Sequence, residues 1–186
     1  VIYLLQSSTW LIDPHWQLLP TSIALFYYSH PHAAASPDGH HPRALLTLVL
    51  VLVWAARLLH NYLRREQWRF GEREDWRYAD MRAQFGRHFW WASLFTVFLG
   101  QTIFIFAPCL SLYAALSPGG APLSALDALG VGCAATGIFL EAVSDTQMDA
   151  FQAARREKRT DESILETGLW AWSRHPNYLG EITWWW

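Results

Sequence analysis

The sequence predicts an all-α protein, a polytopic bundle of membrane helices with charged cytosolic loops and an interfacial helix. Three observations predict it. Apolar residues make up 52% of the chain. The charge is confined to a few segments, as is typical of membrane proteins with charged loops. The 12 Trp residues suit the interfacial belts of a bilayer. A net charge of −2 argues against nucleic acid as a partner, because phosphate binding requires a basic excess.

The apolar runs are interrupted by turn residues, which divide the chain into six expected spans. Residues 1–12 read as the end of one helix, Asp13-Pro14 as a break and residues 17–28 as a second helix. The run 44–62 is about 19 residues, close to the length that crosses a bilayer core. Further spans are expected at 89–116 and 123–143 and from near residue 176.

The distribution of basic residues predicts the orientation of these spans. Of the 14 Lys and Arg, seven lie in residues 61–88 and five in residues 144–175, on the same side of the hairpin 89–143. The opposite turn, residues 117–122, has none. The positive-inside rule therefore places both basic segments in the cytosol. The polar stretch from Ser144 is expected to be helical through Arg159.

These features predict one multi-pass membrane domain embedded in a lipid bilayer. The chain lacks an initial Met and ends in three Trp, which suggests a fragment truncated at both ends. No organelle signal is visible, so the predicted location is an endomembrane such as the endoplasmic reticulum in a eukaryote, or the inner membrane in a bacterium. Gly130, Gly132 and Gly137 would let a neighbouring helix approach closely.

Cysteine and histidine chemistry is not expected. Cys109 and Cys133 lie in apolar runs and are interpreted as small buried hydrophobic residues. The four His of the Pro- and Gly-rich loop 30–42 are not expected to bind a metal, since Asp38 is the one further ligand beside them.

Two clusters of polar residues lie where predicted membrane helices end. Glu141 and Asp145 are four residues apart and share a helix face, with Arg155 further along. Carboxylates there either line a polar cavity or are solvated because the span ends earlier. The second cluster is Arg174-His175-Pro176-Asn177-Tyr178-Leu179-Gly180-Glu181. Pro176 favours a helix that opens near His175, and its free N–H groups, with Arg174, suit a phosphate.

A third cluster ends the predicted span 44–62. Arg57, His60, Asn61 and Arg64 fall on one helical face, and Tyr62 points elsewhere. The alternative is a membrane helix that simply ends in basic residues. No P-loop, Gly-x-Ser-x-Gly or Rossmann Gly-x-Gly-x-x-Gly motif is present.

The order of these motifs resembles the membrane steroid 5-alpha-reductase superfamily, and more closely its domain-of-unknown-function, steroid reductase-like branch. The resemblance covers nearly the whole chain. Its most specific part is the Ser173–Glu181 run preceded by Asp145-Thr-Gln147. The other matching pieces are Trp54–Arg65, Gly71–Met81, Ser93-Leu-Phe with Gln101, Phe151, and Gly168-Leu-Trp170 through Trp186.

This resemblance implies an NADPH-dependent reductase of a carbon–carbon double bond conjugated to a ketone, acting on a hydrophobic, lipid-like small molecule such as a steroid, sterol or fatty enone. The implied cofactor-binding residues are Asp145, Arg174, His175, Asn177 and Tyr178, with Glu141 and Arg155 as weaker matches, and Glu181 is an implied packing partner. The implied catalytic candidates are Tyr62, His60 and Asn61. Asn61 aligns best with the reductases' catalytic Tyr, with Tyr62 one place later. Their membrane Glu has no clear counterpart in this sequence, although Asp13 lies nearby in the N-terminal part.

Two other readings stay open. One is an S-adenosylmethionine-dependent membrane methyltransferase of the isoprenylcysteine carboxyl type, because those enzymes share an Arg-His-Pro-x-Tyr run that opens a terminal membrane helix. The other is a non-catalytic membrane scaffold. The Asp-x-Gln cluster and the Gly71–Tyr78 segment favour the reductase over the methyltransferase.

Overall fold

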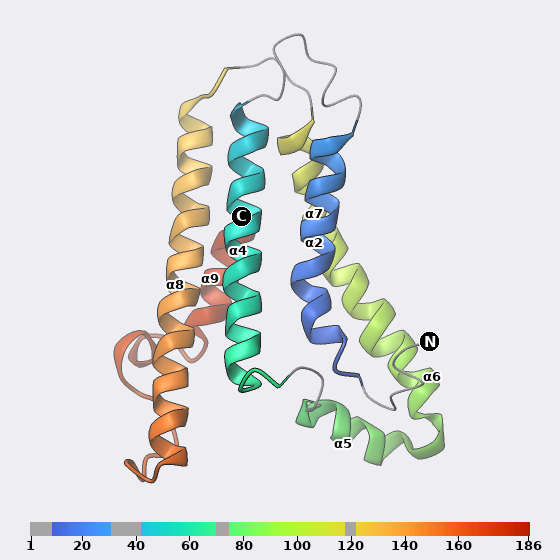
Figure 1. Cartoon of the computed structure of the whole chain (residues 1–186), viewed down its shortest axis with the longest axis vertical. Coiled ribbons are helices and arrows are strands. Elements are labelled where there is room, and N and C mark those ends of the chain that lie inside the picture. Colours follow the sequence, from blue (N-terminus) through green and yellow to red (C-terminus); the bar gives the residue numbers. More distant parts are fainter. Residues whose placement is uncertain (1–8, 31–41, 70–74, 118–121) are drawn as a thin grey trace. The chain divides into compact units, whose positions relative to one another are not determined.

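The computed structural model describes residues 9–30, 42–69, 75–117 and 122–186, and within these ranges it is helical with no β-strand (Figure 1). The predicted all-α class is confirmed. The chain forms two compact units, Val1–Gly120 and Ala121–Trp186. Most of the expected helix over residues 1–12, of the His-rich loop and of the 117–122 turn lies outside the described residues, as does the 71–74 part of the Gly71–Tyr78 segment.

In the described part of the chain, three helices are long and apolar enough to cross a membrane: Pro42–Arg65, Trp76–Leu116 and Ala125–Arg156. The second of these is bent near Gly86, so its membrane-crossing part is the run from Phe89 to Leu116. These helices match the spans expected at 44–62, 89–116 and 123–143. The chain is therefore a membrane protein.

The first unit is built on α2 (Ile12–Ser29), which packs against both α4 (Pro42–Arg65) and α7 (Gly100–Leu116). Figure 1 shows α2 antiparallel to α4. At one end, the Asp13 carboxylate pairs with Arg65 at 3.3 Å. At the other end, the ring centroids of Tyr27 and Tyr113 lie 5.5 Å apart, and this aromatic contact joins α2 to α7. The unit is thus fastened at both ends by side chains distant in sequence.

The break predicted at Asp13-Pro14 is wrong, because α2 begins at Ile12 and contains both residues in its first turn. Proline is tolerated there, since the first N–H groups of a helix have no acceptor within it. Asp13 near this end also suits the positive end of the helix dipole.

A short helix, α5 (Trp76–Phe85), lies crosswise to the long helices of this unit (Figure 1). Asp75 caps it by accepting the Arg77 N–H at 2.9 Å. Gly86 ends it with φ +50°, a conformation that favours glycine.

After Gly86 the chain continues through η1 (Gly86–His88), α6 (Phe89–Ser93), the π-helical η2 (Leu94–Leu99) and α7. The guanidinium carbon of Arg82, on α5, lies 4.3 Å from the centre of the Phe89 ring and 4.9 Å from the centre of the Trp90 ring. These cation–π contacts fix α5 to the start of the membrane helix.

The core of the first unit joins α5 to α2 and η2 through buried Ile12, Tyr78 and Val97. The same region contains a chain of hydrogen bonds. The Trp16 indole donates to Gln101 Oε1 at 2.7 Å, and Gln101 Nε2 donates to the Tyr78 hydroxyl at 3.0 Å. Polar side chains from α2, α5 and α7 are therefore satisfied inside the unit.

The second unit consists of α8 (Ala125–Arg156), η3 (Gly168–Ala171) and α9 (Pro176–Trp185). A capping box starts α8, in which Asp127 accepts the Ser124 N–H at 2.7 Å. The helix ends at Arg156, not at Arg159 as expected. Lys158 adopts φ +56°, which turns the backbone out of the helix. The start of α9 at Pro176 confirms the predicted helix opening.

Replacing Asp75 with alanine should destabilise α5 by about 1 kcal/mol, because the helix loses its N-cap. Hydrogen bonds from the Arg77 side chain lower the pKa of Asp75 below its ordinary 3.8. The carboxylate therefore stabilises the fold above about pH 4, and this contribution is lost as the pH falls through the lowered pKa. Thermal melts of the wild type and the variant should differ at pH 7 and converge in acid. Asp80→Ala, on the same helix, is the control, and an equal effect there would contradict the capping role.

Candidate functional site

The candidate site in the second unit depends on a close approach of α8 and α9, which run antiparallel. A Cβ atom on Gly137 would lie 2.7 Å from both the Gly180 carbonyl oxygen and the Trp184 nitrogen. A Cβ on Gly180 would lie 2.6 Å from Cγ of Glu141. Real Cβ atoms do not approach so closely, so glycine is needed at both positions. The prediction that Gly137 lets a helix approach is confirmed. Gly130 and Gly132 have nothing within 4 Å of such an atom among the described residues, so for them the expectation stays a prediction.

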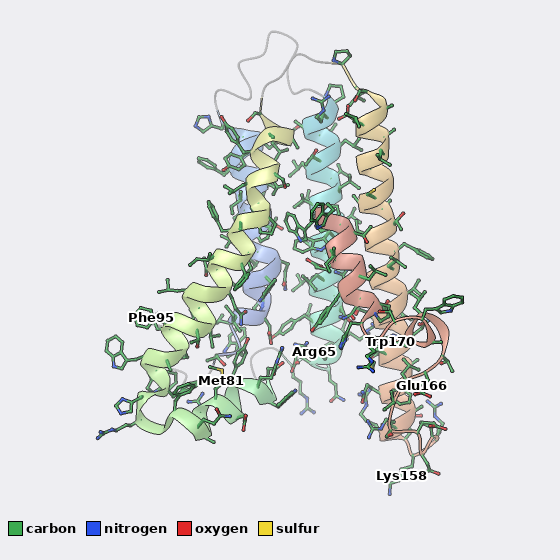
Figure 2. The ribbon with its side chains drawn as sticks, turned by 180° about the vertical axis from the view of Figure 1, so that it is seen from behind. Arg65, Met81, Phe95, Lys158, Glu166 and Trp170 are labelled. Carbon is green, nitrogen blue, oxygen red and sulfur yellow. The ribbon has the colours of Figure 1, made fainter. Side chains whose placement is uncertain are left out.

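The segment before α9 is fixed to α8 by two hydrogen bonds. The Leu169 N–H donates to Gln147 Oε1 at 3.0 Å, and the Trp170 indole donates to the Ser144 carbonyl at 3.1 Å. Gly168, at φ +62°, lies directly against the Gln147 amide. Figure 2 shows Trp170 beside α8 near the start of α9. These contacts determine where α9 begins.

Glu141 lies on the face of α8 that packs against α9. Its spacing from Gly137 and Ser144 puts all three residues on one buried stripe. The side chain is 1% exposed. The reading in which Glu141 is solvated is therefore wrong. Asp145, one turn further on, is only partly covered.

The first turn of α9 presents several hydrogen-bonding groups. His175 is its N-cap residue and makes no side-chain cap hydrogen bond, so the first N–H groups of the helix have no side-chain acceptor from it. Arg174 beside it is exposed. The rings of His175 and Tyr178 are stacked, with their centroids 5.1 Å apart and their planes at 22° to each other. Oδ1 of Asn177 is covered and has no hydrogen-bond partner among the described residues.

The antiparallel register brings most of the predicted cofactor residues to one end of the α8–α9 pair. Because Gly180 lies opposite Glu141, the preceding turn of α9 lies near Ser144 and Asp145. This places two carboxylates of α8 near the turn that carries Arg174, His175, Asn177 and Tyr178. Arg155 does not join them. It lies about 15 Å beyond Asp145 along α8 and faces the Phe151 ring at 5.9 Å.

The predicted catalytic residues lie in the first unit and differ in exposure. Tyr62 is buried, at 6% exposed. Arg65 lies over its ring at 5.7 Å and also pairs with Asp13, so Tyr62 and Asp13 share one cation. His60 is exposed and meets Trp68 edge-on at 6.0 Å. Asn61 accepts a hydrogen bond from Arg64 at 3.2 Å. Of the three, Tyr62 is the one enclosed by the protein, and His60 lies on the opposite side of α4.

Sequence reasoning missed the part that two glutamines play in these arrangements. Gln147 was quoted as part of a motif, yet nothing in the sequence indicated that its amide holds the backbone at Gly168 and Leu169. Gln101 stood out as a polar residue inside an apolar run, which was a usable signal. Its two partners, Trp16 and Tyr78, could not be identified without the fold.

Comparison with known proteins assigns a family but no activity. The family described as "Protein of unknown function (DUF1295)" matches residues 1–186. An uncharacterized protein of the fission yeast Schizosaccharomyces pombe is 27% identical over 199 residues. That alignment covers 96% of this chain, and the chain spans 56% of the yeast protein's length. No solved structure matches the chain.

Gly137→Ala and Gly180→Ala should each lower the free energy of unfolding by about 1–3 kcal/mol, because the added methyl group meets backbone or Glu141. Gly130→Ala and Gly132→Ala provide matched controls on the same helix. With open space around them, they should leave stability unchanged or raise it by up to about 1 kcal/mol, since alanine favours a helix. Thermal unfolding in nanodiscs measures all four. Equal tolerance of all four substitutions would refute the close contact.

Proposed function

The chain belongs to the DUF1295 family, and we propose that it is a membrane reductase that uses NADPH to reduce a carbon–carbon double bond conjugated to a ketone in a lipid-like substrate. The resemblance to the steroid 5-alpha-reductase superfamily motivates this proposal. The membrane helices support it, because a hydrophobic substrate reaches such an enzyme through the bilayer.

The observation that carries the proposal is the group of polar residues at the first turn of α9. The start of a helix carries a partial positive charge and free N–H groups, which favour an anion. Exposed Arg174 adds a guanidinium that can hold a phosphate through two hydrogen bonds. A pyrophosphate is the anion that a dinucleotide would bring here.

The other residues of this turn fit the remaining parts of NADPH. The Asn177 amide, with its covered and unpartnered Oδ1, suits the amide or amino group of a nucleotide base. The stacked rings of His175 and Tyr178 offer a flat surface to a planar ring, and Tyr178 is 58% exposed. Asp145 supplies a partly exposed carboxylate suited to a ribose hydroxyl group, whereas Glu141 is buried in the α8–α9 contact. The residues present therefore fit the cofactor.

NADPH supplies the hydride in this class of reaction. The task of the chain is then to stabilise the negative charge that develops on the carbonyl oxygen of the substrate and to provide a proton. Tyr62 has the suitable group, a hydroxyl in a buried setting. Arg65, held in turn by Asp13, lies 5.7 Å from the centre of the Tyr62 ring and keeps a positive charge beside this side chain. We assign Tyr62 the role of hydrogen-bond or proton donor to the ketone.

Arg174→Ala should weaken NADPH binding about tenfold or more, because a charge-assisted hydrogen bond to phosphate contributes about 1.5–3 kcal/mol. The full-length protein in nanodiscs is titrated with NADPH, and the rise in melting temperature is followed, since a specific ligand stabilises by mass action. Asn177→Ala should also reduce the rise. Arg156→Ala is the matched control, because Arg156 is also exposed but lies about three turns beyond Asp145 on α8.

Two results would count against this cofactor assignment. One is a melting temperature that NADPH does not change. The other is an unchanged NADPH affinity in both Arg174→Ala and Asn177→Ala. A parallel titration with S-adenosylmethionine decides the methyltransferase alternative, and a shift with that ligand but not with NADPH would favour it.

Tyr62→Phe should lower the rate of enone-dependent NADPH oxidation by about 100-fold or more, because the donor to the carbonyl oxygen is lost. NADPH affinity should not change. Tyr113→Phe is the control, a tyrosine near the opposite end of the same unit that is 60% exposed. Steroid, sterol and fatty enones serve as substrates. Full activity of Tyr62→Phe would remove Tyr62 from the mechanism, and no turnover with any of these enones would favour the scaffold reading.

A further inference from the structure

Gln17 is a buried amide in the middle of the first unit. It lies on the stripe of α2 that also contains Pro14, Pro20 and Ala24, and it is 2% exposed. The helices packed against α2 are α4 and α7. Both Oε1 and Nε2 of Gln17 are covered, and neither has a hydrogen-bond partner within the described ranges. Exchanging the two atoms by an amide flip would not change this, because both are unpartnered.

The neighbouring polar side chains on α2 differ from Gln17, because each of them has a partner. Asp13 pairs with Arg65, and the His15 ring meets the Thr102 hydroxyl at 3.2 Å. The Trp16 indole donates to Gln101. A primary amide can donate two hydrogen bonds and accept two, and burying it without any is unfavourable. Gln17 is therefore the exception among these polar side chains of α2.

The register of the helices places this amide at the depth of the proposed catalytic tyrosine. Asp13 meets Arg65 at the end of the antiparallel pair α2–α4 (Figure 2 labels Arg65 at the end of α4). Gln17 is one turn further along α2, about 6 Å deeper. One turn back from Arg65 along α4 are Asn61 and Tyr62. Gln17 and Tyr62 are thus both buried in this unit and lie at a similar depth along the antiparallel pair.

On the deeper side of Gln17, the bundle is apolar. There the buried faces of α2 and α4 contribute Ala24, Val51 and Trp54. An amide at the edge of this apolar region matches a molecule with one oxygen on a hydrocarbon body. A free phosphate or a sugar would leave many polar groups without partners there.

We propose that Gln17 binds the substrate by donating a hydrogen bond from Nε2 to its carbonyl oxygen, and so holds the ketone at the depth of Tyr62. This assignment rests on the proposed enone reductase function. It specifies the substrate further, as a largely apolar molecule with its oxygen buried between helices. An amide matched to that oxygen also discriminates against the same hydrocarbon without it.

The first test compares two glutamines without any ligand. Gln17→Leu should not lower the melting temperature, and should raise it by about 2 °C or more, because an unsatisfied amide is replaced by an apolar side chain of similar size. Gln101→Leu is the matched control and should lower it, because Trp16 and Tyr78 lose their partner. A loss of stability in Gln17→Leu equal to that in Gln101→Leu would mean that the amide is satisfied in the folded protein, and would overturn the assignment.

The second test measures ligand binding by the full-length protein in nanodiscs. The probes are cholest-4-en-3-one, a long-chain α,β-unsaturated methyl ketone, and cholestane, which lacks the oxygen. At least one enone should raise the melting temperature of the wild type, and cholestane should not. In Gln17→Leu the affinity for that enone should fall about tenfold, as expected for one hydrogen bond, while the NADPH-induced shift persists.

The two proposals fail in different ways. Equal enone affinity in the wild type and in Gln17→Leu overturns the role of Gln17 and leaves the reductase standing. No shift with either enone also overturns it. A protein that binds the enone through Gln17 but shows no response to NADPH contradicts the reductase and not the amide site.

Discussion

Hydrocarbon offers no hydrogen-bond partner, and this constraint governs how the polar side chains of both units are arranged. Asp13 pairs with Arg65, and Gln101 connects Trp16 to Tyr78, so these polar groups of the first unit are paired across the four helices α2, α4, α5 and α7. Each pair joins two different helices, so the contacts that satisfy these polar groups also hold the helices together. The buried Gln17 amide has no such partner among the described residues, and in the proposal above a bound ligand supplies one.

In the second unit, Gly137 and Gly180 allow the backbones of α8 and α9 to pack in direct contact. The position of this contact along α8 determines where α9 begins. The Gln147 and Trp170 hydrogen bonds then hold the connecting segment, so the first turn of α9 is positioned from both directions. A dinucleotide requires donors at fixed separations, and a helix end held in this way provides them without a further loop. The rigidity of the α8–α9 contact is therefore a requirement of the proposed binding site.

The sequence predicted the long apolar helices and the helix start at Pro176 well, because length, hydropathy and proline chemistry are local properties. It misplaced the start of α2, because a proline in a first turn looks the same as a proline that breaks a helix. It named Asp145 and the Arg174–Tyr178 run, but it could not indicate that Arg155 lies turns away from them on the same helix. The partners of Gln101, Gln147 and Gln17 depend on the register between helices, and register is a tertiary property that no single segment encodes.

The length of α8 has a mechanical consequence. Its 32 residues extend about 48 Å, and the hydrocarbon core is about 30 Å thick, so about 18 Å of rigid helix extends into water. A membrane helix tilts more in a thin bilayer than in a thick one. A change of about 10° in tilt would swing the outer end of such a lever sideways by about 3 Å. The aqueous end of α8 is thus mechanically coupled to bilayer thickness, so the lipid composition of the surrounding membrane can alter the position of the residues it carries.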